Sequence, residues 1–413
     1  MLAPERRTRA DIRVAVAIAV LVAVVAGVVW WKSEARKTES VTAGQTLSAL
    51  PTPERVPEGV HELWSQADGA AARAIVVGGV MVTGDGGTVT GRNPLTGEQV
   101  WKYQRDLPLC GLESQFGTVV ATYKVERGCS ETTLLNAETG QRLTARSSYM
   151  DDRVRLSVDG TYVLAYGDDR LEMWRSDLVR TLEYGYVDAP VNPHTQQRSG
   201  CTLVSAGSAP SRLAVLERCP GESTDRLTVL NPAPKDATVP EEYSSHRIEL
   251  PGAGVDGARV LAVSDSRIAV YFNGSGSTAP EFVVFDTSGN IVGTHPLSAP
   301  MSDQAMVSRL STSYFVFTGN SLIALNSTTF DPLWGIPNAL GTPALMSGKL
   351  LVPVADGLNV LDPVTGAQTG RIAVQRSDYH GEPISLAVLG PIIAEQRGGK
   401  LYALGTGAAP TGS

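Results

Sequence analysis

Hydrophobic and polar positions divide the chain into two unequal parts. The first is a run of 18 consecutive uncharged residues, Val14 to Trp31, nearly all Val, Ala, Leu or Ile. From His61 onward, short β-prone stretches alternate with turns, and long amphipathic helical windows are missing. Because helices connect the strands of a parallel sheet, this pattern excludes a parallel βαβ fold and predicts an all-β domain.

One turn recurs between the β-prone stretches. Asn93–Gly97 (NPLTG) returns as Asp362–Gly366 (DPVTG), and Asn136–Gly140 (NAETG) is a third copy. Asn or Asp in first place and Gly in last, with strand residues on either side, is typical of a hairpin connection. A hairpin that repeats along a chain indicates a repeat architecture.

A looser search finds this turn at seven positions, which are separated by 43, 40, 55, 55, 40 and 36 residues: Asn93, Asn136, Ser176, Asn231, Asp286, Asn326 and Asp362. The shorter separations match the ~40–45 residues of a four-stranded propeller blade. The two long ones contain insertions, namely the Cys201–Cys219 region with Pro232–Lys235, and the loop Asn273–Pro280. Seven units are therefore expected before the C-terminus.

An eighth unit is expected from the two ends of the β region. Three short β-prone segments end the chain without a fourth: Leu386–Val388, Ile392–Ala394 and Leu401–Leu404. The segment His61–Trp64 stands alone before the first blade, and Trp64 corresponds to Trp101 in the strand after the first turn. Pairing these ends closes the ring and removes two open sheet edges. We therefore expect an eight-bladed β-propeller of four-stranded antiparallel blades, with Leu63 and Trp64 in the closing strand; seven blades is the alternative.

The apolar run is long enough for a transmembrane helix, which needs ~20 mainly apolar residues. Trp30 and Trp31 at its end suit a membrane–water interface. By the positive-inside rule, the basic residues before it place the N-terminus in the cytoplasm: Arg6, Arg7, Arg9 and Arg13. A cleaved signal peptide is the alternative, but the run exceeds the usual apolar core of about 7–15 residues, and no clear cleavage site follows it.

These patterns set the expected domain boundaries. Residues 1–13 are a cytoplasmic N-terminus, 14–31 a transmembrane helix, 32–60 an extracytoplasmic Pro-containing linker, 61–405 the propeller and 406–413 a disordered tail. The linker shows no hydrophobic periodicity, which is typical of a stalk. The expected location is the plasma membrane, as a single-pass protein whose propeller lies outside the cytoplasm.

The four cysteines agree with export. Cys110 and Cys129 are 19 residues apart, and Cys201 and Cys219 are 18 apart. Of three possible connectivities, the two local disulfides Cys110–Cys129 and Cys201–Cys219 are the simplest, and an oxidising compartment preserves them. Four buried thiols are the alternative. No metal site is expected, because no C-x-x-C spacing is present and the five histidines are scattered.

Charge limits the partners. Lys and Arg total 35 against 42 Asp and Glu, which gives a formal net charge of −7. The acidic excess lies in the part expected outside the membrane, whereas binding of nucleic acid requires a basic surface. No nucleic-acid partner is therefore expected.

The strand, the Asn/Asp-x-x-Thr-Gly turn and a Trp four residues later resemble the repeat of PQQ-like (quinoprotein alcohol dehydrogenase-like) β-propellers. The residues that carry this resemblance are Asn93, Gly97, Trp101, Asn136, Gly140, Asp362 and Gly366. In that family Gly-to-Trp contacts join adjacent blades. Residues 157–174 instead resemble a WD40 repeat. The layout of a basic N-terminus, one helix, a stalk and a propeller is similar to that of membrane-anchored proteins of actinobacteria.

Quinone-dependent members of that superfamily hold the cofactor in the central channel between a Trp and adjacent cysteines, and bind calcium through Glu, Asn and Asp. This sequence has no vicinal cysteine pair, so the resemblance implies the fold, and no cofactor is expected. Asp151-Asp152 and Asp168-Asp169 are the carboxylate pairs, but neighbours on a strand point to opposite faces. No G-x-S-x-G or H-E-x-x-H motif is present, and no catalytic residue is predicted.

The leading hypothesis is a membrane-tethered extracytoplasmic scaffold without catalytic activity that binds a protein of the cell envelope. In plan it resembles the propeller that helps to assemble outer-membrane proteins. The alternatives are a sensor that binds a small molecule or glycan, and a degenerate quinoprotein-type enzyme. The insertion Val187–His194 breaks the blade period, and loops on rigid scaffolds often carry recognition. The tryptophans at blade positions are expected to pack in the core: Trp64, Trp101, Trp174 and Trp334.

Overall fold

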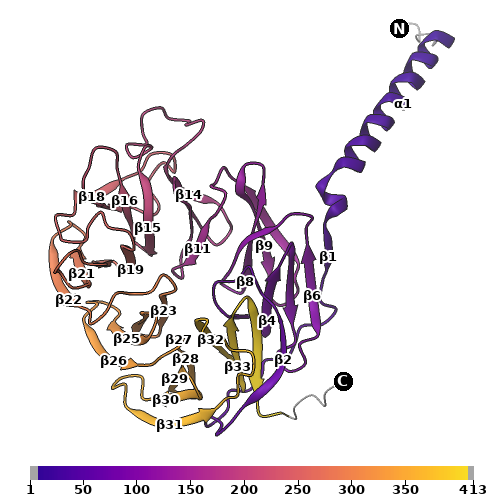
Figure 1. Ribbon diagram of the computed structural model, residues 1–413. Coiled ribbons are helices and arrows are strands. Elements are labelled where there is room, and N and C mark those ends of the chain that lie inside the picture. The colour runs from indigo at the N-terminus through magenta and orange to yellow at the C-terminus, as the bar shows by residue number, and fades with distance from the viewer. Residues whose placement is uncertain (1–7, 408–413) are drawn as a thin grey trace.

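The computed structural model describes residues 8–407 as a closed ring of eight β-sheets with one helix projecting from its edge (Figure 1). Helix α1 spans Arg9–Lys32, the 3₁₀ turn η1 spans Glu34–Lys37, and strand β1 spans Glu39–Val41. The start of the expected cytoplasmic segment, residues 1–7, and most of the expected tail, residues 408–413, lie outside the described residues.

Each blade is a meander of four antiparallel strands, and the first strand of each blade faces the centre of the ring. Blades I to IV consist of β3 (Ile75–Val77), β4 (Val80–Asp85), β5 (Thr88–Arg92), β6 (Gln99–Gln104); β7 (Leu109–Gln115), β8 (Thr118–Val125), β9 (Gly128–Asn136), β10 (Arg142–Ser147); β11 (Arg155–Val158), β12 (Val163–Tyr166), β13 (Arg170–Trp174), β14 (Arg180–Gly185); and β15 (Thr202–Ala209), β16 (Arg212–Arg218), β17 (Arg226–Leu230), β18 (Glu242–Arg247).

Blades V to VIII continue the same order around the ring. They consist of β19 (Arg259–Val263), β20 (Arg267–Phe272), β21 (Glu281–Asp286), β22 (Ile291–Pro296); β23 (Met306–Leu310), β24 (Ser313–Phe317), β25 (Ser321–Asn326), β26 (Pro332–Pro337); β28 (Ala344–Met346), β29 (Lys349–Val354), β30 (Gly357–Leu361), β31 (Gln368–Ala373); and β32 (Ile384–Leu389), β33 (Ile392–Arg397), β34 (Lys400–Gly405), β2 (His61–Ala67). The eight-bladed propeller predicted from the sequence is confirmed.

Blade VIII joins the two ends of the β region. Strand β2 pairs antiparallel with β34, and Trp64 lies opposite Ala403. Leu63 and Trp64 pack with residues of blades VIII and I. A two-residue strand, β27 (Gly341–Thr342), adds to the inner edge of the same sheet, parallel to β32. The ring is therefore closed by backbone hydrogen bonds between segments more than 300 residues apart in the sequence.

The segment expected as a stalk lies along the propeller. Strand β1 adds a fifth strand to blade I by pairing with β6, so residues 33–38 alone separate α1 from the sheet. Farther along, Leu47, Leu50 and Val56 pack against three of the clusters between blades. These apolar residues are single positions in a polar stretch, which is why the sequence shows no period there.

The core is distributed between the blades. Eight buried hydrophobic clusters each combine residues of two neighbouring blades, one cluster for every junction around the ring. At the junction of blades I and II, for example, Trp101 packs with Leu112 and Leu135. Each blade thus contacts mainly its two neighbours, as in other repeat proteins.

The recurring turn connects the third and fourth strands of blades I to VII, and the fourth strand of the preceding blade packs on it. Trp64 Nε1 donates to the carbonyl oxygen of Pro94 (3.0 Å), and Trp101 Nε1 donates to that of Ala137 (2.7 Å). The second turn residue supplies the acceptor in both cases. The side chain of Trp334 lies against the corresponding turn of blade VII.

The last residue of the turn is in the left-handed region. Gly97, Gly140 and Gly366 have φ of 73°, 70° and 71°, and a Cβ on Gly140 would lie 2.7 Å from Trp101 Cβ. Glycine is required there both by the backbone and by the approaching ring. In blade VI, Phe330 takes this place with φ of 63°. Its side chain is fully buried in the hydrophobic cluster between blades V and VI, so a residue other than glycine is accepted at this position.

Candidate functional site at the channel and the loops of blades III and IV

The first strands of the blades surround a central channel that contains two adjoining cavities. One, of about 610 Å³, lies where the first strands of blades III to VI turn into their second strands, and we call it the channel mouth. The other, of about 670 Å³, is lined by blades I to III and VI to VIII, and we call it the channel body. The two share Ser157, Val158 and Val307 to Arg309, so they form one passage.

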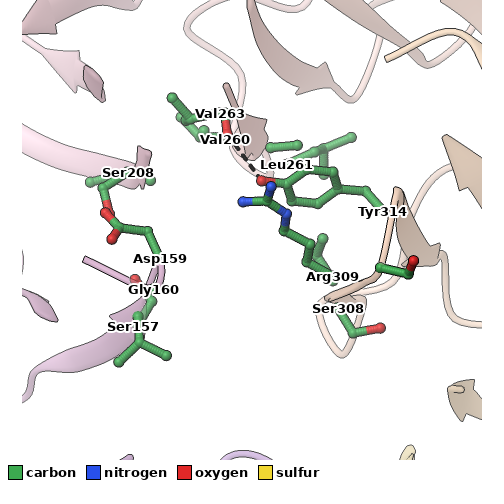
Figure 2. Close-up of a pocket in the computed structure, with 16 residues that line it drawn as sticks. Ser157, Asp159, Gly160, Ser208, Val260, Leu261, Val263, Ser308, Arg309 and Tyr314 are labelled. Atoms are coloured by element: carbon green, nitrogen blue, oxygen red, sulfur yellow. Dashed lines mark hydrogen bonds between the residues drawn. The ribbon is translucent and has the colours of Figure 1, made fainter. Parts of the chain in front are cut away.

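Four charged side chains line this passage: Arg73, Glu113, Asp159 and Arg309. In the channel body, Glu113 accepts hydrogen bonds from Arg73 Nε (3.0 Å) and Nη2 (2.5 Å), so this pair is mutually satisfied. In the channel mouth, Asp159 and Arg309 lie on opposite walls, with Ser208 beside the first and Tyr314 beside the second (Figure 2).

The lining residues do not fit a quinone cofactor. Neither cavity is lined by tryptophan, cysteine or asparagine, which are three of the groups that the family resemblance associates with the quinone and its calcium ion. The two carboxylates that line the passage, Glu113 and Asp159, lie in different cavities, and Glu113 is already paired with Arg73, so they do not form a calcium-binding set. The residues present therefore supply no place for that group.

The two aspartate pairs lie away from the channel. Asp151 Oδ2 accepts hydrogen bonds from the backbone N–H groups of Asp169 (2.9 Å) and Arg170 (3.2 Å), which fixes the turn between β12 and β13. Burial raises the pKa of Asp151, and these hydrogen bonds oppose the rise. Asp152 and Asp168 line a separate cavity of about 490 Å³ between blades II and III. Of these carboxylates, Asp151 thus braces a turn, and Asp152 lies 3.3 Å from Lys124 Nζ.

The predicted disulfides are confirmed. Cys110 is bonded to Cys129 within blade II, and Cys201 to Cys219 within blade IV, with Cα–Cα distances of 5.9 and 4.2 Å. The second bond ties the base of β15 to the loop that follows β16. It therefore closes one end of the long connection from blade III to blade IV, residues 186–201.

This long connection folds back onto the next blade. Asn192 Nδ2 donates to Thr238 Oγ1 (2.7 Å), and Thr195 Oγ1 donates to the carbonyl oxygen of Thr238 (3.0 Å). The backbone N–H of Glu183 donates to the carbonyl oxygen of Ala237 (2.9 Å). The loop 186–201 and the turn 231–241 thus form one body, which we call the insertion platform; Figure 1 shows the first of these loops rising above β14 and β15.

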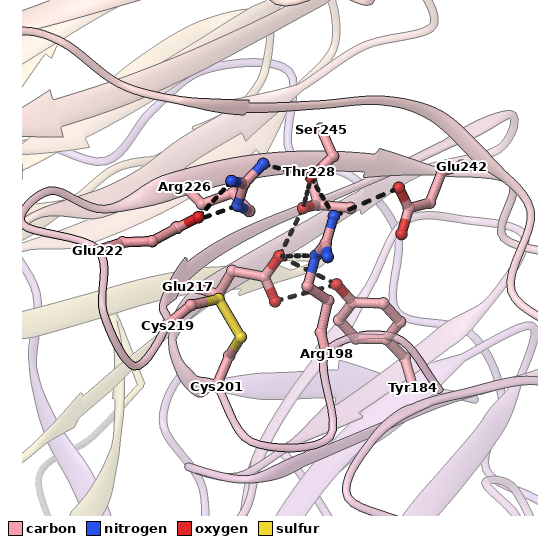
Figure 3. The surroundings of a disulfide bond; sticks show 10 residues. All are labelled: Tyr184, Arg198, Cys201, Glu217, Cys219, Glu222, Arg226, Thr228, Glu242 and Ser245. Atoms are coloured by element: carbon pink, nitrogen blue, oxygen red, sulfur yellow. Dashed lines mark hydrogen bonds and ion pairs between the residues drawn. A yellow bond between two sulfur atoms is a disulfide. The ribbon is translucent and has the colours of Figure 1, made fainter. Parts of the chain in front are cut away.

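A buried carboxylate holds the platform to blade IV (Figure 3). Glu217 is fully buried and accepts hydrogen bonds from Tyr184 (2.9 Å) and Thr228 (2.5 Å). Arg198, from the platform, lies 3.5 Å from Glu217 and 3.6 Å from Glu242. Burial raises the pKa of Glu217, while the hydrogen bonds and Arg198 oppose this rise. The same burial, with the Glu217 charge, raises the pKa of Tyr184.

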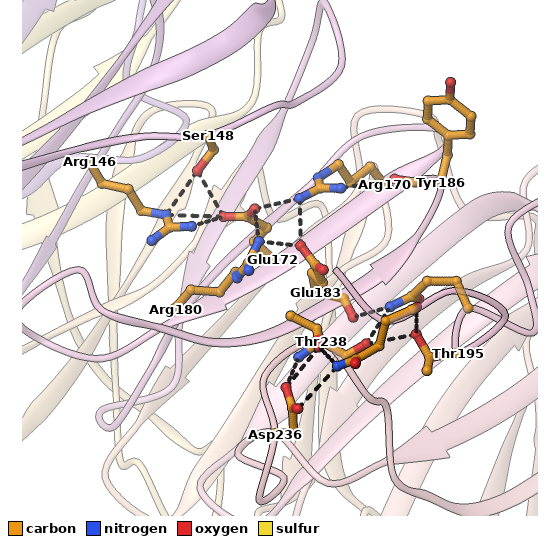
Figure 4. Close-up of polar contacts among 12 residues, drawn as sticks. Arg146, Ser148, Arg170, Glu172, Arg180, Glu183, Tyr186, Thr195, Asp236 and Thr238 are labelled. Carbon is orange, nitrogen blue, oxygen red and sulfur yellow. Dashed lines mark hydrogen bonds and ion pairs between the residues drawn. The ribbon is translucent and has the colours of Figure 1, made fainter. Parts of the chain in front are cut away.

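A second charged network supports the platform from blade III (Figure 4). Glu172 is fully buried and accepts hydrogen bonds from Trp174 Nε1 (2.7 Å) and Arg170 Nη2 (2.7 Å), and Arg146 lies 3.1 Å away. Burial opposes the charge of Glu172, but the two arginines and the hydrogen bonds outweigh it and lower its pKa. Trp174 is therefore a core residue with a polar partner.

The outer surface of the platform is partly apolar. Val191, within the loop, is 78% exposed. Tyr186, at the start of the loop, pairs with Tyr149 of the preceding connection, with ring centroids 6.4 Å apart. Both rings are exposed, and Figure 4 shows Tyr186 pointing away from the charged network beneath it. The period break in the sequence identified the loop, but not its partner at 231–241 or the tyrosine pair. These meet only through the fold.

Comparison with protein families agrees with the fold over part of the chain. A family model described as outer membrane protein assembly factor BamB matches residues 57–169. No curated protein matches the sequence. Among solved structures, the N-terminal domain of Nup159 is 11% identical over 87% of this chain and 99% of its own, with a TM-score of 0.45.

Two further structures are similar at the same level. Sqt1 of Saccharomyces cerevisiae is 9% identical over 87% of this chain and 98% of its own, with a TM-score of 0.49. The dihydro-heme d1 dehydrogenase NirN is 15% identical over 87% of this chain and 73% of its own, with a TM-score of 0.48. At scores below 0.5 these likenesses carry nothing about function. The match over residues 57–169 and the eight blades support the PQQ-like β-propeller repeat that the sequence predicts.

Proposed function

We propose that the protein is a scaffold of the cell envelope, tethered to the membrane by α1, whose insertion platform binds a protein partner. The observation that carries the proposal is the platform itself, a long loop fixed by a disulfide and buried ion pairs that presents exposed aromatic and apolar side chains. Interfaces are enriched in tyrosine and arginine and bind best where the contact surface is rigid before binding.

The matched family supports an interaction role. The model that covers residues 57–169 is described as an assembly factor, which works by contact with other proteins. Because the match ends before the platform, it supports the general role of a scaffold and says nothing about the partner. We propose no catalytic activity.

The membrane tether is supported by the exposure of α1. None of its described residues is buried against the propeller, although nearly all from Val14 to Val29 are apolar. A helix with this surface is stable in a lipid environment, where its backbone groups are satisfied internally. At its end, the Arg36 guanidinium lies 3.9 Å from the Trp31 ring centroid, an arrangement suited to the interface with water. The two disulfides favour an extracytoplasmic position of the propeller.

Site-specific photocrosslinking in native membranes tests the partner. A photoreactive residue is placed at Val191, and the control carries it at Val364, which is 77% exposed on the turn of blade VII. We expect a discrete adduct from position 191, none from position 364, and loss of the adduct when Tyr149 and Tyr186 are both replaced by serine. Equal adducts at both positions, or none at position 191, would count against the platform as the binding surface.

The tether is tested separately by extraction. The full chain should require detergent for release from membranes and should keep its intact mass, whereas a chain that begins at residue 33 should be released by salt or alkali. A mature protein that has lost residues 1–31 would contradict the tether without affecting the platform.

A further inference from the structure

The channel mouth carries two opposite charges that are not paired with each other. Arg309 extends from β23 of blade VI and is exposed to the cavity, and among the residues the structure describes it forms no ion pair. Asp159 lies in the turn after β11 of blade III, on the facing wall (Figure 2). In the channel body, by contrast, Arg73 and Glu113 pair directly. Opposite charges that serve the fold are expected to pair in this way.

Neighbouring side chains fix the position of the Arg309 guanidinium. Its guanidinium carbon lies 5.5 Å from the ring centroid of Tyr314, within the range of a cation–π contact. The Tyr314 ring is itself fixed, because its hydroxyl donates to the carbonyl oxygen of Val263 (3.0 Å) and its edge packs on Phe330. The ring lies beside the guanidinium, which Figure 2 shows extending into the cavity, where its N–H groups can meet an anion. Beside it, Ser308 Oγ has no hydrogen-bond partner among the described residues.

Asp159 is equally fixed. Its Oδ1 accepts hydrogen bonds from the backbone N–H groups of Thr161 (2.7 Å) and Tyr162 (2.7 Å), and its Oδ2 accepts one from Ser208 Oγ (2.6 Å). These neutral donors set the position of the carboxylate without cancelling its charge. A further carboxylate, Asp265, lines the adjoining opening of about 220 Å³ together with Arg309 and Tyr314.

We propose that the channel mouth binds a small zwitterion with an apolar body, its carboxylate at Arg309 and its protonated amine at Asp159. A dianion would be repelled by Asp159 and a dication by Arg309, whereas a dipolar ligand satisfies both walls. The space between the charges is lined by apolar groups, including Val158, Val260 and Val307. A volume of about 610 Å³ lies within the range of small-molecule sites. This site is independent of the insertion platform and of its partner.

Short valine peptides test the ligand class, because blocking either end removes one charge and little else. Binding of valine, divaline and trivaline to the full chain in detergent is measured by titration calorimetry, beside the N-acetyl and C-amide forms of each. Hydrogen bonds to charged groups are worth roughly tenfold to a hundredfold in affinity. At the best length, the free peptide should therefore bind at least tenfold more tightly than either blocked form.

Two variants assign the ends. R309Q should abolish the preference for a free carboxylate and keep that for a free amine, and D159N should do the reverse; the asparagine can still accept from the turn, and an unchanged melting temperature verifies the fold. R371Q is the control, an exposed arginine paired with Asp356 on the rim. The proposal fails if blocked and free forms bind equally, if no length binds, or if R371Q weakens binding as much as R309Q.

Discussion

Asp68 provides a test of how the ring is closed. It follows the closing strand β2, is fully buried, and accepts a hydrogen bond at Oδ1 from the backbone N–H of Gly84 (2.8 Å), while Oδ2 has no partner among the described residues. Burial raises its pKa from 3.8 to about 7; the Gly84 hydrogen bond and Arg92 oppose the rise, and Asp85 adds to it. The junction of blades VIII and I therefore contains a carboxyl group that is protonated below neutral pH.

The sign of the effect follows from the two pKa values. Below the unfolded pKa of 3.8, Asp68 is protonated in both states and imposes no cost. As the pH rises toward 7, Asp68 ionises in the unfolded chain first, so the free energy of unfolding falls. Once both states are ionised, the total loss is about 4 kcal/mol, because each unit of pKa difference corresponds to 1.36 kcal/mol. D68N removes the charge and keeps an acceptor for the Gly84 N–H, so its unfolding free energy should not fall in this way as the pH rises.

The measurement is urea unfolding of the full chain in detergent at pH 5 and pH 8, followed by tryptophan fluorescence. Between these two values the difference in unfolding free energy between D68N and wild type should shift in favour of D68N by roughly 3 kcal/mol. D356N, at an exposed carboxylate on the rim, is the control and should leave the pH dependence unchanged. Parallel curves for D68N and wild type would refute the buried neutral acid.

Two further predictions concern the blade junction and the platform. G140A and G117A both place alanine at a φ near 70°, which costs about 1–2 kcal/mol from the backbone alone. Only at Gly140 would the new Cβ meet a neighbour, Trp101, so G140A should destabilise the chain more than G117A. Equal losses of unfolding free energy in urea would contradict the packing of Trp101 on this turn. Replacing Cys201 and Cys219 with serine should lower the unfolding free energy by about 3 kcal/mol, as expected for a disulfide that closes a loop of this length. The same change should speed proteolysis within residues 186–201. An unchanged rate of cleavage there would show that the ion pairs alone fix the platform.

The sequence was most informative where the physics is local. A turn that needs Asn or Asp first and Gly last is set by neighbouring residues, so its copies mark the third and fourth strands of blades I to VII directly. The lone strand at His61 and the three C-terminal strands indicated closure because an open sheet edge is costly. The packing of Leu50 and Val56 against the blades could not be predicted, since single apolar residues in a polar segment carry no period.

The candidate site was hidden for a related reason. Arg309 and Asp159 face each other only because blades III and VI lie across the ring, and nothing near either residue in the sequence indicates the other. Glu217 and Arg198 are closer in sequence, but their pairing depends on the way the loop folds back. The Val187–His194 insertion could be located from the blade period, whereas the chemistry it presents came only from the tertiary structure.

The tryptophans of the repeat predict an aromatic contact between blades. The structure shows that they also make a hydrogen bond, and that this hydrogen bond is present at junctions that lack a tryptophan. Trp64 and Trp101 donate to the carbonyl oxygen of the second turn residue in the next blade. At the junction of blades III and IV, Thr181 Oγ1 donates to the same position, Pro232 (2.7 Å), and between blades IV and V, Ser244 Oγ donates to Thr287 (2.9 Å). A short hydroxyl side chain thus replaces the indole N–H while the acceptor stays in place.

The change from an indole to a hydroxyl group coincides with the insertion platform at the junction of blades III and IV. An indole covers the turn of the next blade and leaves little room for additional chain, whereas threonine and serine make the same hydrogen bond and leave the rim open. The platform occupies that space between blades III and IV, and His246 packs on Gly289 in the next junction. The Glu172 and Glu217 networks and the disulfide compensate for the apolar packing that an indole would provide there. At the junction of blades III and IV, ion pairs and a covalent bond therefore stand where the repeat has an indole.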